Sequence, residues 1–434
     1  MRIAIIGTGV AGLGAAHRLH LEHDLVVYEA GSHVGGHANT VEVAGPSGSI
    51  AVDTGFIVYN ERNYPLLTGL FDELDVPTQP SDMSFSVSVG DGAFEYEGSA
   101  KGLFAQRSNL LSPAHLRMGA DILRFSREAR ALLAAGHGGP ADAPLGAFVR
   151  ERGFSRAFVD RYLVPMAGAV WSATPEDVLA FPAGRIAAFM DNHGLLDLRG
   201  RPQWRTVAGG SREYVRRVSA GFRRSIRLGT AVREVRRGPG GVRVADARGR
   251  VERFDGVVFA SHPDETLAML GPDATRDERR ILGAFTYREN FAVLHGDAGL
   301  MPRRRSVWAS WNSMSPAAPA PGDERRPAAV TYWMNRLQNL DPAVPLFLSL
   351  NPLREPRADA VLGEFAYAHP QFDGAAVAAQ AALPRIQGAD RAWFAGAWCG
   401  HGFHEDGLRS GFEAAGALLA SERVRLRVAS ADVA

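Results

Sequence analysis

The sequence predicts an α/β fold in which a mostly parallel sheet carries helices on both faces, and three observations support this. First, an apolar strand at residues 3–6 runs into the glycine pattern G-x-G-x-x-G at 7–12 and then into a helical stretch. Second, another apolar strand, residues 25–29, follows that helix. Third, a buried strand at 391–396 precedes a small-residue helix start at 407–418. Strands that alternate with helices are typical of parallel sheets.

The glycine pattern predicts a dinucleotide site. Gly7 allows the tight turn, Gly9 lets a pyrophosphate approach the backbone, and Gly12 lets helix and strand pack closely. The helix N-terminus that follows offers unpaired N–H groups and the positive end of its dipole to phosphate. Glu29 ends the second strand, where a carboxylate can accept hydrogen bonds from ribose hydroxyls.

A second glycine pair indicates which dinucleotide binds. The chain continues Ala30-Gly-Ser-His-Val-Gly35-Gly36-His37 and then Val52-Asp53-Thr-Gly55. Here it resembles the flavin amine oxidase and phytoene desaturase superfamily, in which such a pair lies beside the FAD pyrophosphate, although the family usually has Arg at the position of His37. Residues 391–418 resemble the family's C-terminal strand and helix, which point at the flavin. Residues 230–261 resemble the return to the FAD domain, where the backbone at Val232 would hold adenine.

The stretch Gly396-Ala-Trp-Cys-Gly-His401-Gly-Phe-His404-Glu-Asp-Gly407 resembles a narrower bacterial branch of this superfamily. That branch is often encoded beside methyltransferases of the cyclopropane-fatty-acid-synthase type. A partner methyltransferase is therefore one expectation that the resemblance raises.

The resemblance implies a Rossmann-like FAD-binding domain and an interleaved substrate domain with a mixed sheet and helices, α+β overall. We assign 1–75, 204–270 and 385–422 to the FAD domain, 76–203 and 271–384 to the substrate domain, and 423–434 to a tail. FAD is expected to be non-covalent, because no cysteine precedes Cys399. The motifs and the resemblance assign to FAD Gly7, Gly9, Val10, Ala11, Gly12, Glu29, Ala30, Gly35, Gly36, His37, Thr40, Gly55, Val232, Gly396, Asp406, Gly407, Leu408 and Gly411.

The densest titratable cluster is His401, His404, Glu405 and Asp406, which the family places near the isoalloxazine ring. Either histidine is a candidate catalytic base, with an ordinary pKa near 6.5. We favour His404, because Glu405 and Asp406 adjoin it and could orient its ring. The alternative is that the cluster caps the next helix. These residues and Cys399 are too crowded for usual zinc-ligand spacing, so no metal site is predicted.

The substrate is expected to be apolar. Amine oxidases of the superfamily commonly use a lysine near the flavin. The one lysine found, Lys101, lies in a Gly-Ser-rich stretch of the first insertion, so this lysine is expected to be missing and an ordinary amine oxidase is disfavoured. Trp171, Tyr332 and Trp333, expected on strands, would line an apolar pocket, and Arg185 or Arg336 could hold a carboxylate head.

We therefore predict an FAD-dependent oxidoreductase of lipid metabolism. It would abstract hydride from a fatty-acyl or other lipid-like substrate and leave a C=C bond, as a desaturase does. Three alternatives stay open: an amine oxidase with an unusual active site, a non-redox flavin-dependent isomerase, and a flavin-binding partner subunit of a lipid methyltransferase.

Composition bounds the remaining possibilities. The 434 residues are 46% hydrophobic, and a net charge of +1 gives no case for nucleic-acid binding. A single cysteine fits a reducing cytoplasm, and no signal peptide or membrane-spanning run is recognised.

Two local patterns fall within the first insertion. Residues 83–89 and 94–96 predict a hairpin around Asp91-Gly92, and residues 113–134 predict a helix with an apolar stripe at Met118, Ile122, Phe125, Ala129 and Leu132. The opposite face would hold Arg117, Asp121, Arg124 and Glu128. This face is expected to be solvated, with peripheral membrane contact as the alternative. Residues 315–324 predict a loop.

Overall fold

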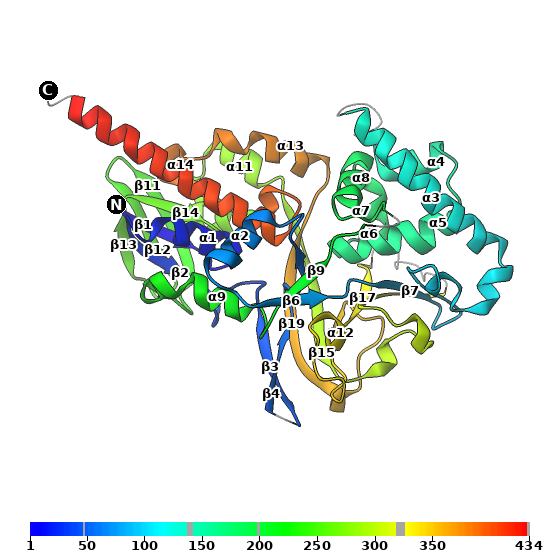
Figure 1. Cartoon of the computed structure of the whole chain (residues 1–434). Helices are drawn as coiled ribbons and strands as arrows, with labels where there is room; N and C mark the ends of the chain where they lie inside the picture. Colours follow the sequence, from blue (N-terminus) through cyan, green and yellow to red (C-terminus); the bar gives the residue numbers. More distant parts are fainter. Residues whose placement is uncertain (47, 137–140, 142, 198–199, 318–325, 432–434) are drawn as a thin grey trace.

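One half of the protein is built on a five-stranded parallel sheet with the order β10–β2–β1–β14–β20 (Figure 1). The computed structural model describes all residues except 47, 137–140, 142, 198–199, 318–325 and 432–434. The strands come from three distant parts of the chain: β1 (Arg2–Ile6), β2 (Asp24–Tyr28), β10 (Ile226–Arg227), β14 (Gly256–Phe259) and β20 (Ala392–Phe394).

Alternate side chains of these strands enter two different cores, as the period of two in a strand requires. Ile3 and Ile5 face helices α1 (Val10–Leu19) and α14 (His404–Ala431). Ala4 and Ile6 face the opposite layer. That layer combines an antiparallel sheet with three helices: β11 (Val232–Gly238), β12 (Gly241–Asp246), β13 (Val251–Phe254), α10 (Pro263–Leu270), α11 (Arg276–Leu282) and α13 (Gly374–Ala382). The second face is thus covered by a sheet as well as by helices, and α11 and α13 pack on the parallel sheet although the sequence assigned them to the substrate domain.

The other half contains a mixed seven-stranded sheet with the order β19–β15–β18–β17–β16–β7–β8, in which β7 and β16 are parallel and the other pairs antiparallel. The predicted hairpin is confirmed as β7 and β8. The strands are β7 (Phe85–Val89), β8 (Phe94–Glu97), β15 (Thr286–His295), β16 (Trp311–Ser315), β17 (Ala329–Trp333), β18 (Phe347–Leu350) and β19 (Val361–Gln371). The long pair β15 and β19 runs toward the parallel-sheet half (Figure 1).

Helices α3 to α8 form a lobe over one end of this sheet (Figure 1). Their bounds are α3 (Pro113–Ala134), α4 (Leu145–Glu151), α5 (Arg156–Phe158), α6 (Val164–Trp171), α7 (Pro175–Ala180) and α8 (Ala183–Asn192). The predicted stripe of α3 is confirmed for Met118, Phe125, Ala129 and Leu132, which are buried, whereas Ile122 is only partly buried. The predicted opposite face was wrong in one respect, because Asp121 is buried.

Asp121 is buried because it satisfies polar groups from two directions. Its carboxylate accepts from the Ser155 N–H at 2.9 Å and pairs with Arg117 and Arg124.

Trp171 was also misplaced, since it ends helix α6 and lies on no strand, whereas Tyr332 and Trp333 do lie on β17.

Smaller elements connect the two halves: β3 (Thr40–Gly45) with β4 (Gly48–Asp53), the three-stranded sheet of β5 (Tyr59–Asn60), β9 (Trp204–Val207) and β6 (Thr78–Ser81), and the helices α2 (Pro65–Glu73), α9 (Arg212–Val218) and α12 (Met334–Leu337). The predicted loop at 315–324 lies mostly outside the described residues. Residues 423–431, predicted as a tail, continue helix α14. Among the described helices, none combines the length and apolarity needed to cross a bilayer.

Candidate functional site

The turn from β1 into α1 forms an open cradle. Gly7 has φ +105°, and a Cβ there would lie 2.6 Å from the Ala260 carbonyl oxygen, so only glycine fits. A Cβ at Gly12 would lie 2.0 Å from the Gly7 oxygen, which shows how closely the helix packs on the turn. A Cβ at Gly9 would meet nothing within 4 Å. Helix α1 has no side-chain cap and no acidic residue in its first turn, so its N-terminal N–H groups, including those of Val10 and Ala11, are open to an anion.

Glu29 follows β2 and holds the edge of this cradle. One carboxylate oxygen accepts from the Thr8 N–H at 3.0 Å and from the Thr8 hydroxyl, and the other accepts from the Gly31 N–H at 2.7 Å. The backbone of Glu29 also accepts from Thr230 N–H at 2.7 Å, which brings the segment before Val232 to the same place. The structure therefore gathers the glycine turn, Glu29 and the start of β11 at one edge of the sheet.

The second glycine pair lies against the first turn. Gly35 and Gly36 have φ values of +125° and +58°, and a Cβ at Gly36 would lie 3.1 Å from the Cα of Gly9. The Gly35 N–H donates to the Thr8 hydroxyl at 3.3 Å. Both glycine motifs therefore border the same cradle, as a long anionic ligand requires.

Helix α14 approaches this cradle through small residues. A Cβ at Gly407 would lie 2.7 Å from a Val10 methyl, and a Cβ at Gly411 would lie 2.1 Å from the Ala11 carbonyl oxygen. The Leu408 side chain packs against Gly14 of α1, so only its backbone is free to face a ligand. The helix begins at His404, three residues before the predicted start at Gly407.

His404 lies in the first turn of α14, but the groups that hold it are not the predicted ones. Its Nε2 is hydrogen-bonded to the Tyr214 hydroxyl at 2.9 Å, and its ring stacks on Phe56 with centroids 3.7 Å apart. Glu405 instead accepts from the Leu66 and Leu67 N–H groups and so caps helix α2. Asp406 accepts from the Phe403 N–H at 3.1 Å.

The expectation that Glu405 and Asp406 orient the His404 ring was therefore wrong. Burial lowers the pKa of His404 to about 3, which keeps the imidazole neutral at physiological pH. The pKa of His401 is also lowered by burial.

Two further buried histidines, His37 and His369, lie side by side. The His37 ring lies 5.6 Å from that of His369 on β19, and its Nε2 is inaccessible and has no described partner. Burial lowers the pKa of His37 to about 3 and that of His369 to about 4, and the charges of His369, His262 and His404 would further disfavour a proton on His37. His369 Nδ1 is 3.0 Å from the Ser172 hydroxyl.

Sequence reasoning missed His369 as a site residue. Its neighbour on the strand, Tyr367, shares its face because the two are two residues apart. The Tyr367 hydroxyl lies 2.7 Å from that of Thr54 and accepts from Asn39 at 3.1 Å. Alternation along β19 was the signal available, but it does not say which face of the strand meets a ligand.

Thr40 and Gly55 lie next to the segment that follows the second glycine pair. The Thr40 hydroxyl donates to Asp53 at 2.5 Å, and a Cβ at Gly55 would lie 2.1 Å from the His37 carbonyl oxygen. Asp53 also accepts from Ser211 and Gln338, and burial raises its pKa to about 6. The Thr40 side chain is thus committed to a buried network.

The sequence matches the family described as flavin containing amine oxidoreductase over residues 10–293. The chain belongs to this family. This match confirms the predicted superfamily and its FAD cofactor.

Relatives and solved structures agree with this assignment. A Mycobacterium tuberculosis protein named as a flavin-containing monoamine oxidase, AofH, is 28% identical over 264 residues, which are 58% of this chain and 54% of that protein. The chain thus spans about half the length of this curated relative.

Two solved structures share the fold at 16% identity. Cyclohexylamine oxidase from Brevibacterium oxydans IH-35A has a TM-score of 0.70, with 97% of this chain and 99% of that chain covered. The fatty acid isomerase from P. acnes that produces CLA has a TM-score of 0.68, with 95% and 97% covered.

The residues of this flavin amine oxidoreductase fit FAD. The open space over Gly9, the uncapped start of α1 and the adjoining second glycine pair form one cradle, and these groups suit a pyrophosphate. Ala30, Val232 and Gly396 lie at the ends of β2, β11 and β20, beside that cradle or the start of α14. Cys399 lies beyond β20 with a pKa raised by burial, so its thiol stays protonated.

The predicted substrate residues fall into two separate groups. Trp171 contacts Phe189 of α8 with ring centroids 4.6 Å apart, and Arg185 lies on the same helix. Tyr332 packs edge-on against Trp311 at 4.8 Å, and Trp333 lies beside Trp308 and Arg305. The structure therefore does not bring Trp171 and Trp333 together.

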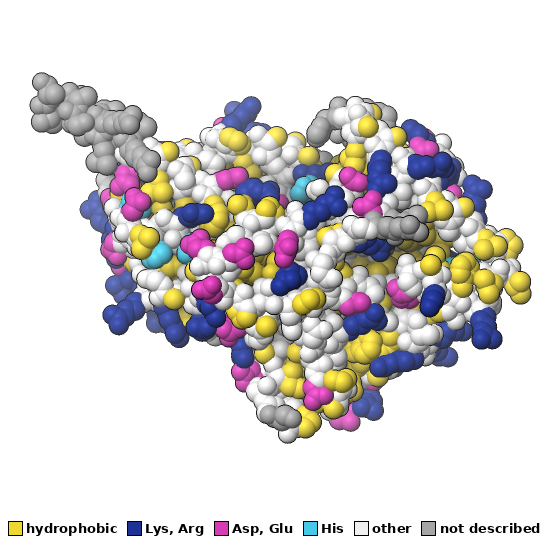
Figure 2. Space-filling model, viewed as in Figure 1, with side chains coloured by type: hydrophobic (Ala, Val, Ile, Leu, Met, Phe, Trp, Pro, Cys, Tyr) yellow, Lys and Arg dark blue, Asp and Glu magenta, His cyan; other side chains and the backbone are white. Residues whose placement is uncertain are grey.

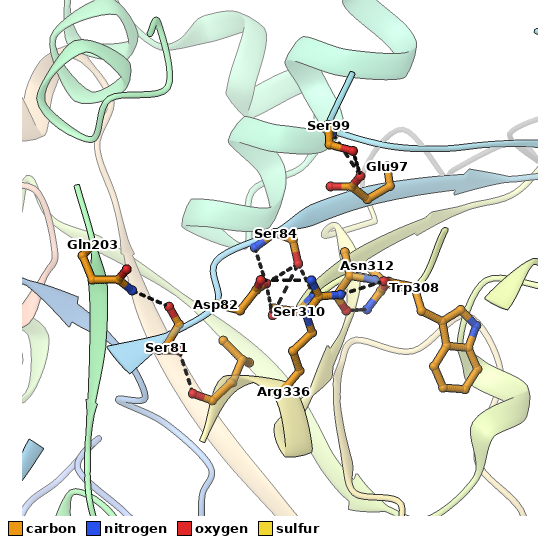
Figure 3. A network of polar contacts seen from close by, with 12 residues as sticks. Ser81, Asp82, Ser84, Glu97, Ser99, Gln203, Trp308, Ser310, Asn312 and Arg336 are labelled. Carbon is orange, nitrogen blue, oxygen red and sulfur yellow. Dashed lines mark hydrogen bonds and ion pairs between the residues drawn. The ribbon is translucent and has the colours of Figure 1, made fainter. Parts of the chain in front are cut away.

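Arg336, the alternative to Arg185 as a carboxylate anchor, already has a partner. Its guanidinium donates to Asp82 at 3.0 Å and to the Trp308 carbonyl oxygen at 3.2 Å (Figure 3). Ser84 and Ser310 donate to the same carboxylate. This closed network leaves Arg185 as the candidate anchor.

Proposed function

We propose that the protein is an FAD-dependent oxidoreductase that removes a hydride and a proton from adjacent carbons of a fatty-acyl substrate and leaves a C=C bond. The observation that carries the proposal is an aromatic row with a guanidinium at one end. Arg185 and Phe189 are four residues apart on α8 and therefore share a face of that helix. Phe189 stacks on Phe403 at 5.3 Å, and Phe403 directly precedes His404. The row thus runs from the guanidinium to the start of α14.

Arg185 suits an acidic head group. It donates to the Gln380 side-chain oxygen at 2.5 Å and lies over Phe372, but it forms no ion pair with any described residue. A half-buried guanidinium without a carboxylate favours binding of an anionic substrate, since Arg recognises carboxylates bidentately. Gln380 also donates to the Trp398 and Gly400 carbonyl oxygens, which fixes Arg185 beside the turn that precedes α14.

A neutral histidine can accept the proton that the substrate must lose. Bound FAD supplies the hydride acceptor. The proton leaves from the neighbouring carbon, which becomes strongly acidic as positive charge develops beside it, so a weak base suffices. The contact between Tyr214 and Nε2 of His404 fits either tautomer of the ring. In the tautomer in which Nε2 donates, Nδ1 carries a lone pair and has no described hydrogen-bond partner. We propose that Nδ1 of His404 accepts the proton that leaves the substrate.

The comparisons support the substrate class and leave a second candidate. One protein of this fold, from P. acnes, is a fatty acid isomerase. The same apolar row would serve an isomerase that returns the hydride to another carbon of the chain. The relative named as a monoamine oxidase would instead favour an amine as substrate. However, Lys101 is exposed and lies near β8, away from His37, His369 and His404, so it does not supply the lysine that amine oxidases of the superfamily commonly use.

Anaerobic stopped-flow mixing with long-chain unsaturated fatty acids and with small primary amines tests the proposal. We expect the flavin absorbance to bleach with fatty acids only, and the product to be two mass units lighter than its substrate. Bleaching with amines alone would refute the proposal. A product of unchanged mass would favour the isomerase.

Arg185→Met tests the anchor, and Arg336→Met is the matched control. We expect the first to raise KM for the free acid roughly 10- to 150-fold, as expected for a lost charged hydrogen bond, with no effect on the methyl ester. Arg336→Met should leave both substrates unaffected. An equal effect of Arg185→Met on acid and ester would remove the anchor role.

A further inference from the structure

Helix α3 exposes a second apolar face, opposite the face that enters the core. Leu116 and Leu123, seven residues apart and therefore on one side of the helix, are 51% and 50% exposed. Ala120 and Arg127 lie on the same side and are exposed. The two described acidic side chains of this helix, Asp121 and Glu128, lie on its flank and pair with arginines.

The segment before α3 continues this surface. The 3₁₀ helix η2 (Arg107–Leu111) ends in Leu110 and Leu111, which are 52% and 87% exposed. In Figure 2 hydrophobic side chains gather at the right-hand end of the molecule, where this segment runs into α3. Among the residues whose side chains the structure describes, four of the nine large exposed hydrophobic side chains therefore lie within residues 110–123. We call these four leucines the leucine patch.

The charged side chains along the leucine patch are mostly basic, although Glu97 and Glu128 flank the segment. Between residues 98 and 127 the sequence has five basic side chains and one carboxylate, Asp121, which is buried. Lys101, Arg107 and Arg127 are exposed and form no ion pair with any described residue. Exposed leucines among unpaired cations are complementary to a surface with an apolar interior and anionic groups above it.

We propose that the leucine patch binds the surface of an anionic phospholipid bilayer. Leucine side chains enter the boundary between headgroups and acyl chains, and each nearby cation adds attraction to anionic headgroups. A partner protein of ordinary composition would need matching acidic groups around an apolar centre, which a bilayer supplies everywhere. The proposal stands independently of the proposed reaction, although α3 packs against α8, which carries Arg185.

Flotation of the FAD-loaded protein with vesicles tests the proposal. We expect binding to phosphatidylcholine vesicles that contain about 30% phosphatidylglycerol, and weaker binding at higher salt. Leu111→Ser combined with Leu110→Ser should lower the bound fraction at least tenfold. Both side chains are largely exposed, so the fold should be retained. Leu21→Ser, at an 85% exposed leucine after α1, is the matched control and should bind as the unchanged protein does.

The single lysine provides a second readout. An amine-reactive label should modify Lys101 in free protein and be blocked by anionic vesicles, with the N-terminal amine as the internal reference. Equal loss of binding in the Leu21 variant, or unchanged labelling of Lys101 on vesicles, would overturn the proposal. Protection of Lys101 that rises with protein concentration in the absence of lipid would assign the patch to a second copy of the chain and would also overturn it.

Discussion

Replacing Gly9 by alanine should separate cofactor binding from folding. Gly9 has φ −62° and ψ 175°, which alanine adopts without strain, and its Cβ would meet no protein atom within 4 Å. The substitution should therefore leave the apoprotein intact or stabilise it by about 0.4–1 kcal/mol, because it restricts the unfolded chain. The free space is where the backbone would receive the FAD pyrophosphate. Loss of one charge-assisted hydrogen bond, about 1.5–3 kcal/mol, weakens FAD binding roughly 10- to 150-fold.

Two measurements check this expectation. Titration calorimetry of the deflavinated protein gives Kd for FAD, and thermal unfolding of the same sample gives the stability of the apoprotein. The control is Gly12→Ala, whose Cβ would lie 2.0 Å from the Gly7 carbonyl oxygen and should lower the melting temperature of the apoprotein. Unchanged FAD affinity in Gly9→Ala would refute the placement of the pyrophosphate. An apoprotein that melts earlier than the unmodified one would refute the absence of strain at this position.

Three further predictions concern stability. His295 is fully buried and its pKa is lowered by burial to about 4, so it stays neutral in the folded protein while the unfolded chain takes up a proton near pH 6.5. The contribution of His295 to the free energy of unfolding is present above pH 6.5 and falls by about 2 kcal/mol from about pH 7 to 5. In urea titrations at several pH values, His295→Phe should remove that part of the pH dependence of the free energy of unfolding. Glu29→Ala leaves the part-buried Thr8 and Gly31 N–H groups without their acceptor and should destabilise the apoprotein by about 1 kcal/mol as well as weaken FAD binding, and an effect on FAD alone would contradict the observed contacts. Arg237→Met breaks a buried pair with Glu278 and should cost about 3–5 kcal/mol by chemical denaturation, whereas Arg280→Met at an exposed pair should cost under about 1 kcal/mol.

The sequence predicted those parts of the molecule in which backbone conformation and local spacing decide the outcome. The turn at Gly7, the close packing at Gly12 and the second glycine pair each need a residue without a side chain, so they leave a clear mark in the sequence. The hairpin of β7 and β8 and the buried stripe of α3 likewise follow from a period of two and a period near 3.6.

The missed features depend on contacts between distant segments. Nothing near His404 indicates Tyr214 or Phe56, and Glu405 caps a helix more than 330 residues earlier in the chain. His369 reaches the site because β19 pairs with β15 and crosses toward the other half. Local spacing cannot report such pairings, since the same residue pattern is compatible with several tertiary partners.

The parallel sheet also constrains when the protein can bind its cofactor during synthesis. Strand β20 forms one edge of the sheet next to β14, and α14 packs on α1 through Leu408 and Gly411. The ribosome must therefore release residues 404–418 before the first nucleotide-binding turn receives this covering helix. The helical lobe of residues 113–192 draws its contacts largely from within itself and can fold earlier. A nascent chain would thus complete part of the substrate half first and acquire its flavin only after α14 has been released.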